Sequence, residues 1–365
     1  MIVNKKHGVQ GSSSVRRIAT AIAASAVTLI MVAGCAQSSG GDGNAASDTP
    51  VDIRFSTGGA QPPNEMEAAI FSKELHDKGV TPGMGKDYNV KMTFAKGTPE
   101  AQGLLIADQV DMTTLAFSTI ASTVQKNAVQ DGISIVVGHF VDGFSGKFSN
   151  TYLVRSDSGI NSVADLKGKN IGVNSIGSAV DVILRNAIIK AGLDPEKDMN
   201  FVEIGFGAMG QALREKKVDL GSMVQPFSAA EVKQGGVKVL LTAADSVGEN
   251  SAIAVVARNA FLKKNSAAVK SFLADWVSGL KWLDDPKNHA EAVKLMSGIS
   301  KTPEESLNLF YGGEQDYHRD DNGCVSAKAL QAGVDAMVKV GYLDTTVDMA
   351  GLVDSSYLPD PSACK

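Results

Sequence analysis

Short apolar segments with strand-like alternation are repeatedly followed by segments with helical periodicity, and this alternation constrains the fold more than any other feature of the sequence. We expect strands at 51–56, 88–94, 110–116, 133–138, 151–155, 169–174, 200–204, 218–224, 237–241 and 252–257. The clearest helix is 180–191, whose apolar residues recur at i, i+3, i+4 and i+7 before Gly192 ends it. The pattern predicts an α/β fold with a largely parallel sheet arrangement.

Other helices are expected at 65–78, 100–107 and 120–126. After the last strand the character of the chain changes, and from 265 to 340 the sequence predicts nearly continuous helix. Trp276 and Trp282 are six positions apart and do not share a helix face cleanly. We interpret both tryptophans as residues of the core or of inter-helix packing, and not as part of a ligand site.

Size and charge exclude several classes of protein. The 365 residues are 44% hydrophobic and 21% charged, which is about what two folded domains need and unlike a disordered chain. Lys and Arg number 35 against 40 Asp and Glu, a net charge of −5. A nucleic-acid-binding protein usually has a basic excess, so we expect no nucleic-acid partner.

The amino terminus reads as an export signal. Four basic residues precede an uncharged apolar run at 18–32, which is too short for the ~20 residues of a membrane-spanning helix. The run ends in Val32, Ala33, Gly34 and Cys35, which resembles the bacterial lipobox. We therefore expect a lipoprotein signal peptide at 1–34, a lipid on Cys35, a flexible tether at 35–50 and attachment to the membrane by lipid alone.

Two alternatives at the amino terminus stay open. The protein could be secreted without a lipid, and Arg16 and Arg17 leave twin-arginine export as a second route. Removal of 1–34 takes away four positive charges and no acid, so the exported part has 31 basic and 40 acidic residues and a net charge of −9.

Two thiols remain in the exported part, at Cys324 and Cys364. An even number of cysteines in an oxidising compartment favours a disulfide, with two unpaired thiols as the alternative.

Catalytic and metal-binding motifs do not occur in the sequence. It contains no GxSxG, HExxH or GxxxxGK[ST] pattern, the five histidines are dispersed, and no cluster of Cys and His suggests a metal site. Gly205, Gly207 and Gly210 match GxGxxG, but the following strand ends in Gln225 and not in the acid that a dinucleotide site requires. We expect no cofactor and no enzymatic activity, and we interpret the glycines as a tight turn whose backbone approaches a ligand.

A sharper signal is the turn 174–178 before the clearest helix. Ser178 is a suitable N-cap, with Asp181 three residues later. Free backbone N–H groups and the positive helix end would favour an anionic group at this turn. A capped helix that binds nothing is the alternative.

One resemblance covers most of the exported chain. The segment 153–194 contains SDSGINSVADLKGKNIGV, a serine-rich turn and a helix ending in AGLD, and 211–223 reads QALREKKVDLGSM. These segments, with 224–227 and 108–117, resemble the extracytoplasmic solute-binding proteins of ABC importers of the nitrate, sulfonate and taurine type.

The resemblance implies a type II periplasmic-binding-protein fold, with two lobes joined by two crossing strands. Lobe 1 would comprise 51–152 and 251–365, lobe 2 would comprise 153–250, and the patch 245–249 would suit a hinge. Closure of the lobes would capture a solute for a permease and ATPase of the same system, with no bond made or broken. We expect a monomer.

The resemblance also implies which turns face the cleft. The ligand-binding candidates are Gly59, Gln61, Ala116, Phe117, Ser118, Thr119, Asn150, Thr151, Ser175, Gly177, Ser178, Gln225 and Phe227. Val224 and Gln225 stand where the family often has Trp and Glu, and no Arg or Lys lies within these turns. We expect the ligand to be a small organic anion, either a sulfonate or a carboxylate, with aromatic acids included. Neutral hydrogen-bond donors would hold it.

The resemblance also covers three other functions. A binder of a thiamine-precursor pyrimidine and a sensory binding lipoprotein remain as alternatives. A pyrimidine-forming enzyme of the same fold consumes its own histidine; the export signal and the absence of His from the predicted cleft turns weigh against it.

Overall fold

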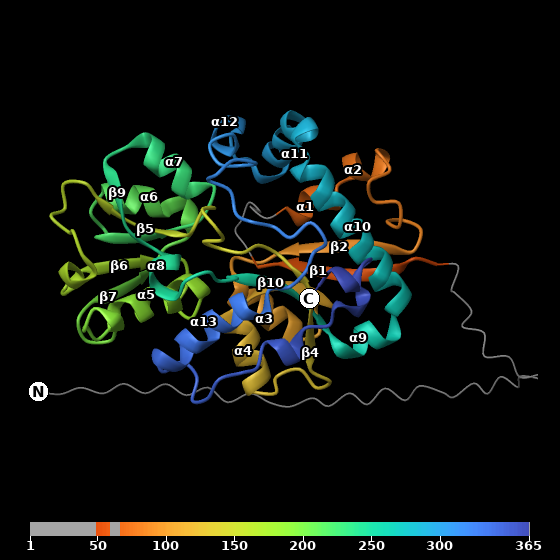
Figure 1. Ribbon diagram of the computed structural model, residues 1–365, viewed down its shortest axis with the longest axis horizontal. Helices are drawn as coiled ribbons and strands as arrows, with labels where there is room; N and C mark the ends of the chain where they lie inside the picture. Colours follow the sequence, from red (N-terminus) through yellow and green to blue (C-terminus); the bar gives the residue numbers. More distant parts are fainter. Residues whose placement is uncertain (1–48, 59–65, 365) are drawn as a thin grey trace, which may run out of the picture. The chain divides into compact units, whose positions relative to one another are not determined.

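The computed structural model describes residues 49–58 and 66–364. The expected signal peptide, nearly all of the tether, the lipidation site Cys35 and the candidates Gly59 and Gln61 lie outside the described residues. Within them, each expected strand forms, and the strands divide between two five-stranded sheets (Figure 1).

The first sheet has the order β2-β1-β3-β10-β4. Its strands are β1 (Val51–Thr57), β2 (Tyr88–Phe94), β3 (Met112–Ala116), β4 (Ile133–Gly138) and β10 (Ile253–Arg258). β1 pairs in parallel with β2 and β3, whereas β10 runs antiparallel to β3 and β4.

The second sheet has the order β7-β6-β8-β5-β9. Its strands are β5 (Thr151–Arg155), β6 (Asn170–Val173), β7 (Asn200–Glu203), β8 (Leu220–Met223) and β9 (Val237–Thr242). β6 is parallel to β7 and β8, and β5 is antiparallel to β8 and β9.

Four strands of each sheet run in the same direction, as the expectation of largely parallel sheets requires, and one strand, β10 or β5, runs antiparallel beside an edge strand. β5 follows β4 of the first sheet, and β10 follows β9 of the second. Each is thus the strand by which the chain enters one sheet from the other. We call each sheet with its covering helices a lobe; the lobe boundaries at 152 and 250 stay a prediction.

Helices cover the sheets and connect the strands (Figure 1). Their bounds are α1 (Glu67–Ile70), α2 (Lys73–Asp77), α3 (Thr98–Ile106), α4 (Phe117–Gln125), α5 (Ala179–Lys190), α6 (Phe206–Arg214), α7 (Phe227–Gln234), α8 (Ala243–Val247), α9 (Asn259–Lys264), α10 (Ser266–Asp284), α11 (His289–Ser300), α12 (Glu304–Leu307) and α13 (Ala327–Lys339). Short 3-10 turns lie at Val163–Leu166, Pro286–Asn288, Ala350–Leu352, Ser355–Tyr357 and Pro361–Ala363. No helix in the described part of the chain is both long and apolar enough to cross a bilayer.

Two helix expectations are wrong in instructive ways. The segment 65–78 is broken at Ser72, whose side chain accepts a hydrogen bond from the N–H of Leu75 and so starts a new helix, α2. The stretch 265–340 is interrupted, since 308–326 contains no helix. Gly312 and Gly323 have φ of +73° and +74° there, a conformation that a helix does not contain.

The patch 245–249, expected as a hinge, is also mostly helical. Three of its residues lie in α8. Reciprocal hydrogen bonds between Thr242 and Asp245 cap the start of this helix, and within the patch only Gly248, after the helix end, has a positive φ.

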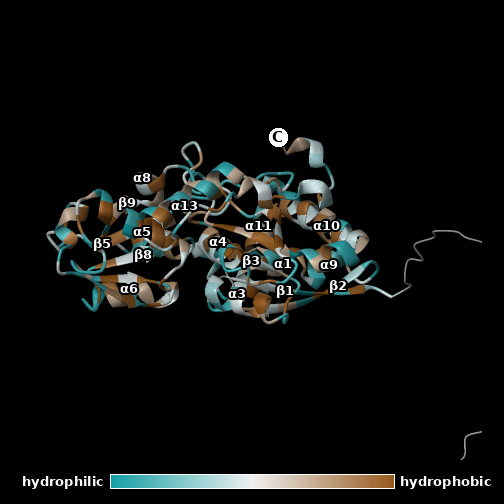
Figure 2. Ribbon diagram, turned by 90° about the horizontal axis from the view of Figure 1, so that it is seen from below, coloured by the Kyte–Doolittle hydropathy of each residue, from teal (hydrophilic) through white to brown (hydrophobic). Residues whose placement is uncertain are grey.

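Aromatic packing holds α10 on the first sheet. Trp276 is almost completely buried, and its ring lies 5.9 Å from that of Phe55 in β1 and 6.1 Å from Phe272. The role expected for Trp276 is confirmed. In Figure 2 brown, hydrophobic residues run through the strands and the adjoining helices, whereas many connecting turns are teal.

The second lobe is packed around α5. The side chains of Ile183, Leu184 and Ile188 are fully buried, as the helical periodicity predicts, and Val182 is fully buried although it lies off the predicted apolar face.

A disulfide joins Cys324 to Cys364, with Cα atoms 5.3 Å apart. It ties the carboxyl-terminal end of the chain to the loop that lies against β4, where the N–H of Gly138 donates to the carbonyl of Gly323. A Cβ at Gly138 would stand 2.4 Å from the carbonyl oxygen of Cys324, so only glycine permits this approach.

Replacing both cysteines by serine should lower the free energy of unfolding by about 3–4 kcal/mol, because the bond closes a loop of 40 residues in the unfolded chain. Urea unfolding of the double variant and of the wild-type protein, each purified without reductant, measures the difference. Equal unfolding midpoints would contradict the prediction.

Candidate functional site

A cavity of about 140 Å³ is lined from both lobes. Since one water needs ~10–15 Å³ by this measure, the space is large enough for a small organic molecule. First-lobe strands contribute residues at their ends, and the second lobe contributes the start of α5 and the turn after β8. The lining is Gly58, Met66, Ala69, Thr98, Ala116, His139, Phe140, Asn150, Asn174, Ser178, Ala179, Val180, Phe206, Val224, Gln225, Pro226, Ala252, Ile253, Met296, Ile299, Ser300, Thr302, Leu307, Phe310, Tyr311, Tyr317 and Arg319.

The structure brings four of the sequence candidates together in this lining: Ala116, Asn150, Ser178 and Gln225. Among the described candidates, those that lie outside the lining are Phe117, Ser118, Thr119, Thr151, Ser175, Gly177 and Phe227. Phe117 is fully buried against Gly333 of α13, and the hydroxyl of Thr151 is hydrogen-bonded to that of Ser228.

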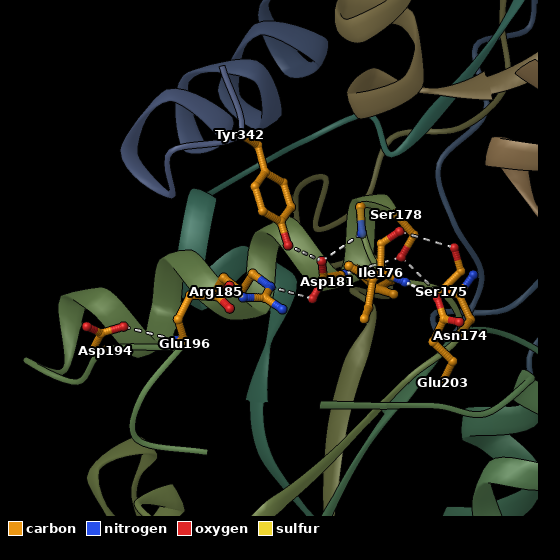
Figure 3. Close-up of polar contacts among 12 residues, drawn as sticks. Asn174, Ser175, Ile176, Ser178, Asp181, Arg185, Asp194, Glu196, Glu203 and Tyr342 are labelled. Atoms are coloured by element: carbon orange, nitrogen blue, oxygen red, sulfur yellow. Dashed lines mark hydrogen bonds and ion pairs between the residues drawn. The ribbon is translucent and has the colours of Figure 1, made fainter. Parts of the chain in front are cut away.

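Acidic side chains occupy part of the turn before α5 (Figure 3). The N–H of Ile176 donates to Glu203 Oε1 at 2.7 Å, and the N–H of Gly177 donates to Asp181 Oδ2 at 2.8 Å. The expectation that these N–H groups are free is therefore wrong. Ser178 does cap the helix, as its side chain accepts from the N–H of Asp181 at 3.4 Å.

Asp181 also connects α5 to the segment after α13. Its carboxylate accepts from Arg185 Nε at 2.8 Å and from the hydroxyl of Tyr342 at 2.9 Å, and Figure 3 shows the Tyr342 ring reaching toward it. Burial is the main cause that raises the pKa of Tyr342, with the Asp181 charge next. The positive end of α5 thus already has a buried carboxylate beside it.

Tyr317 joins three parts of the cavity wall. Its hydroxyl donates to Asn150 Oδ1 at 2.6 Å and accepts from the N–H of Gln225 at 3.2 Å. Gln225 in turn donates through Nε2 to the carbonyl of Gln315 at 2.9 Å, and the Tyr317 ring stacks on Phe140 with centroids 4.0 Å apart. The segment 308–326 therefore links the turn after β8 to the connection before β5.

An arginine and a histidine of the lining were missed by sequence reasoning. Arg319 lies in the stretch 308–326, which the sequence predicts as helix. His139 directly follows β4, at a turn outside those that the resemblance selects. The signals that could have located the break are the pair Gly312 and Gly313 and the run 320–323, Asp-Asp-Asn-Gly, which favours a turn.

The GxGxxG motif serves packing. Gly205 precedes α6, and Gly207 and Gly210 lie within it. A Cβ at Gly210 would lie 1.9 Å from the Glu231 side chain of α7, so this glycine allows the two helices to approach. None of the three glycines belongs to the described lining of the cavity.

Asp142 lies where the chain leaves the first lobe, and its side chain is buried. It exchanges backbone hydrogen bonds with Asn250 on the return connection, at 2.7 and 3.1 Å. Its carboxylate accepts from Ser149 Oγ at 2.5 Å and from the N–H of Asn150 at 2.8 Å. Burial outweighs these bonds and raises the pKa of Asp142 to about 6.

This shift predicts a pH dependence of stability. Between the ordinary carboxyl pKa of 3.8 and about 6, the folded state holds a proton that the unfolded state has released. The contribution of Asp142 to the free energy of unfolding is therefore present below pH 4 and is lost as the pH rises through about 6, with a change of about 3 kcal/mol.

Asp142→Asn should remove this pH-dependent contribution to the free energy of unfolding. The variant should therefore lose less stability than the wild type between about pH 4.5 and pH 7.5. Urea unfolding at the two pH values measures it. The same loss in both proteins would rule out Asp142 as its source.

Two lobes that are connected twice and face each other across a cavity form the architecture of the periplasmic binding proteins. The chain is an ABC-importer solute-binding protein of the nitrate, sulfonate and taurine type. A family model described as NMT1/THI5 like matches residues 86–289, more than half of the chain, and the chain belongs to that family.

Sequence relatives agree with this class. A protein of Bacillus subtilis (strain 168) assigned to the binding of aliphatic sulfonates is 24% identical over 267 residues, which cover 73% of this chain and 76% of the relative. A protein of Brucella abortus (strain 2308), described only as a binding protein, is 30% identical over 123 residues, 33% of this chain and 38% of its own length.

Solved structures share the fold. The periplasmic aliphatic sulphonate binding protein SsuA of Escherichia coli superposes with a TM-score of 0.62 at 18% identity, over 84% of this chain and 92% of that one. The periplasmic nitrate-binding protein NrtA of Synechocystis gives a TM-score of 0.65 at 15% identity, over 84% and 87%. As a member of this class, the chain is a binding protein and not an enzyme.

Proposed function

We propose that the protein captures a small organic anion, a sulfonate or carboxylate with an apolar or aromatic body, outside the cytoplasm. Closure of the two lobes on the solute produces the form that the permease and ATPase of an ABC importer accept. The observation that carries this proposal is the composition of the cavity lining, which comes from both lobes and is mainly apolar with a few polar groups.

The lining suits an organic body better than a bare inorganic ion. Phe140 and Phe206 offer rings, and Ile253 and Ile299 offer aliphatic surface. Polar atoms come from side chains such as Thr98, Asn174 and Ser178, and from the start of α5. A strongly hydrated inorganic anion would lose its water against apolar side chains without replacement, whereas an organic acid buries its body favourably.

The candidate residues from the sequence have different roles in this proposal. We infer that Ala116, Asn150, Ser178 and Gln225 contact the solute directly, since they belong to the lining. Ser175 and Gly177 lie in the adjacent turn and would shape it, as would Phe227, which packs on Phe206 with centroids 6.2 Å apart.

Organic acids should raise the melting temperature of the purified protein by mass action. A ligand at 100 times its Kd adds about 2.7 kcal/mol to the free energy of unfolding. The panel consists of butane-1-sulfonate, benzenesulfonate, benzoate and hexanoate, with inorganic nitrate and sulfate as small-ion controls and an aminopyrimidine as a competitor class. No shift with any organic acid, or a larger shift with the aminopyrimidine, would overturn the proposal.

We further propose that the protein is a monomeric lipoprotein held at the outer face of the membrane by Cys35, with the lobe boundaries near 152 and 250. The match at 32–35 lies at the end of the apolar run of an export signal, which supports this reading.

Cys35→Ser should release the protein from the membrane, because the thiol that carries the lipid is lost. Detergent phase partitioning of cell extracts measures it, with the wild-type protein expected in the detergent phase and the variant in the aqueous phase. Wild-type protein in the aqueous phase would show that the lipid is absent.

A further inference from the structure

Arg319 is a buried cation in the wall of the cavity. Only 9% of its side chain is exposed. Its two Nη atoms donate to the two carboxylate oxygens of Asp316, at 3.0 and 3.1 Å. Asp284 Oδ1 lies 3.9 Å from Nη1, beyond hydrogen-bond distance. Asp316 therefore binds the guanidinium group of Arg319 at the end formed by the two Nη atoms.

The Nε edge of the guanidinium group has no protein acceptor at Nε in the described part of the chain, and we call this unpaired edge the open edge. Its Nε–H is buried. A guanidinium is always a donor, and the edge that carries Nε and one Nη matches two oxygens of a carboxylate or sulfonate. A buried donor without an acceptor is costly, so an acceptor brought by a ligand would gain more here than at the surface.

His139 provides a second buried atom without a partner. Its side chain is 8% exposed, and its Nε2 is 3.0 Å from Oε1 of the fully buried Glu67 of α1. Nδ1 has no partner among the described residues. Because Nε2 is paired with the Glu67 carboxylate, Nδ1 is the ring nitrogen left for an oxyanion, to which an imidazole N–H donates.

The two positions belong to the same part of the wall. The N–H of Val141 donates to the carbonyl of His318 at 2.8 Å, in an antiparallel bridge, so the chain around His139 runs beside the chain around Arg319. Phe140 follows His139 and stacks on Tyr317, two residues before Arg319, which gives the ligand an aromatic surface next to the donors.

We propose that the acid group of the solute is bound on this wall, by the Nε edge of Arg319 with His139 as the second donor. This inference rests on the proposed function and specifies where the acid group and the apolar body lie. The body then extends along Phe140 and the apolar side chains of the lining.

The start of α5 is the competing position for the acid group. Ala179 and Val180 line the cavity there, but Asp181 and Glu203 already bind the adjacent N–H groups and place two carboxylates beside the helix end. Arg319 also has acidic neighbours, Asp316 and Asp284, but both lie toward its Nη atoms rather than at its open Nε.

The test uses Arg319→Lys and His139→Gln in the full exported chain. Lysine keeps the charge beside Asp316 but loses the bidentate edge. Isothermal titration with benzoate and butane-1-sulfonate should give a Kd about 10–100-fold weaker for each variant. The Kd for the neutral benzamide should be the same in the variants and the wild type. His76→Gln, a substitution of the same type in α2 outside the described lining, should not change the Kd.

Asp284→Asn should act in the opposite direction. It removes a negative charge near Arg319 without touching the open edge, so the acids should bind more tightly, by about threefold or more, and benzamide should not. This variant and His139→Gln carry the test if Arg319→Lys does not fold, as judged by circular dichroism.

The outcomes separate the two ideas. Wild-type protein that binds none of the acids overturns the proposed function. Wild-type protein that binds an acid, with Arg319→Lys or His139→Gln binding it equally well, overturns the inference alone. A larger loss with Ser178→Ala than with either of these variants would place the acid group at α5 instead.

Discussion

The hydroxyl of Tyr317 is the contact on which the arrangement of the cavity depends. It is buried, it donates to the side chain of Asn150 and it accepts from the backbone of Gln225. Asn150 lies on the connection into the second lobe, and Gln225 follows β8 of that lobe. One side chain therefore holds this connection and the turn after β8 against the segment 308–326. Burial is the main cause that raises the pKa of Tyr317 well above its ordinary value, which keeps the hydroxyl neutral and able to donate.

Buried carboxylates organise the other junctions in the same manner. Asp142 collects donors where the chain passes between the lobes, Asp181 collects them between α5 and Tyr342, and Asp275 of α10 collects two backbone N–H groups and the hydroxyl of Tyr88. Each accepts at least two hydrogen bonds, which is what a buried charged group requires. The acidic excess of the chain is thus partly structural.

Local pattern was sufficient for most of the fold. Strands β2 and β4 lie where the alternation predicts, because period 2 and the flanking turns act over a few residues. The prediction of helix over 308–326 failed because the helical periodicity of the neighbouring α11 and α13 does not continue through the turn-forming residues between them. Strand direction depends on which lobe the chain comes from, and periodicity carries no information on that.

The site was predictable only where a motif places a residue in a turn. Ser178 and Gln225 were found this way, whereas Arg319 and His139 come from positions that no local pattern marks. The turn at Ile176 and Gly177 lies where the sequence predicts it. Its free donors were not predictable, because Glu203, from another strand, accepts a hydrogen bond from the N–H of Ile176. Which donors are free is a property of the tertiary structure.

An acidic protein that binds an anion must rely on donors close to the solute. The net charge, −5 for the whole sequence and −9 without the expected signal peptide, repels an anion only weakly at physiological salt, because charges beyond about 8 Å are largely screened. Within the cavity the screening is lost, and a guanidinium with one edge open then acts at short range on whatever enters. The same low dielectric makes the open edge costly when it is empty, so the wall that holds Arg319 gains most from a solute that carries two oxygens and an apolar body.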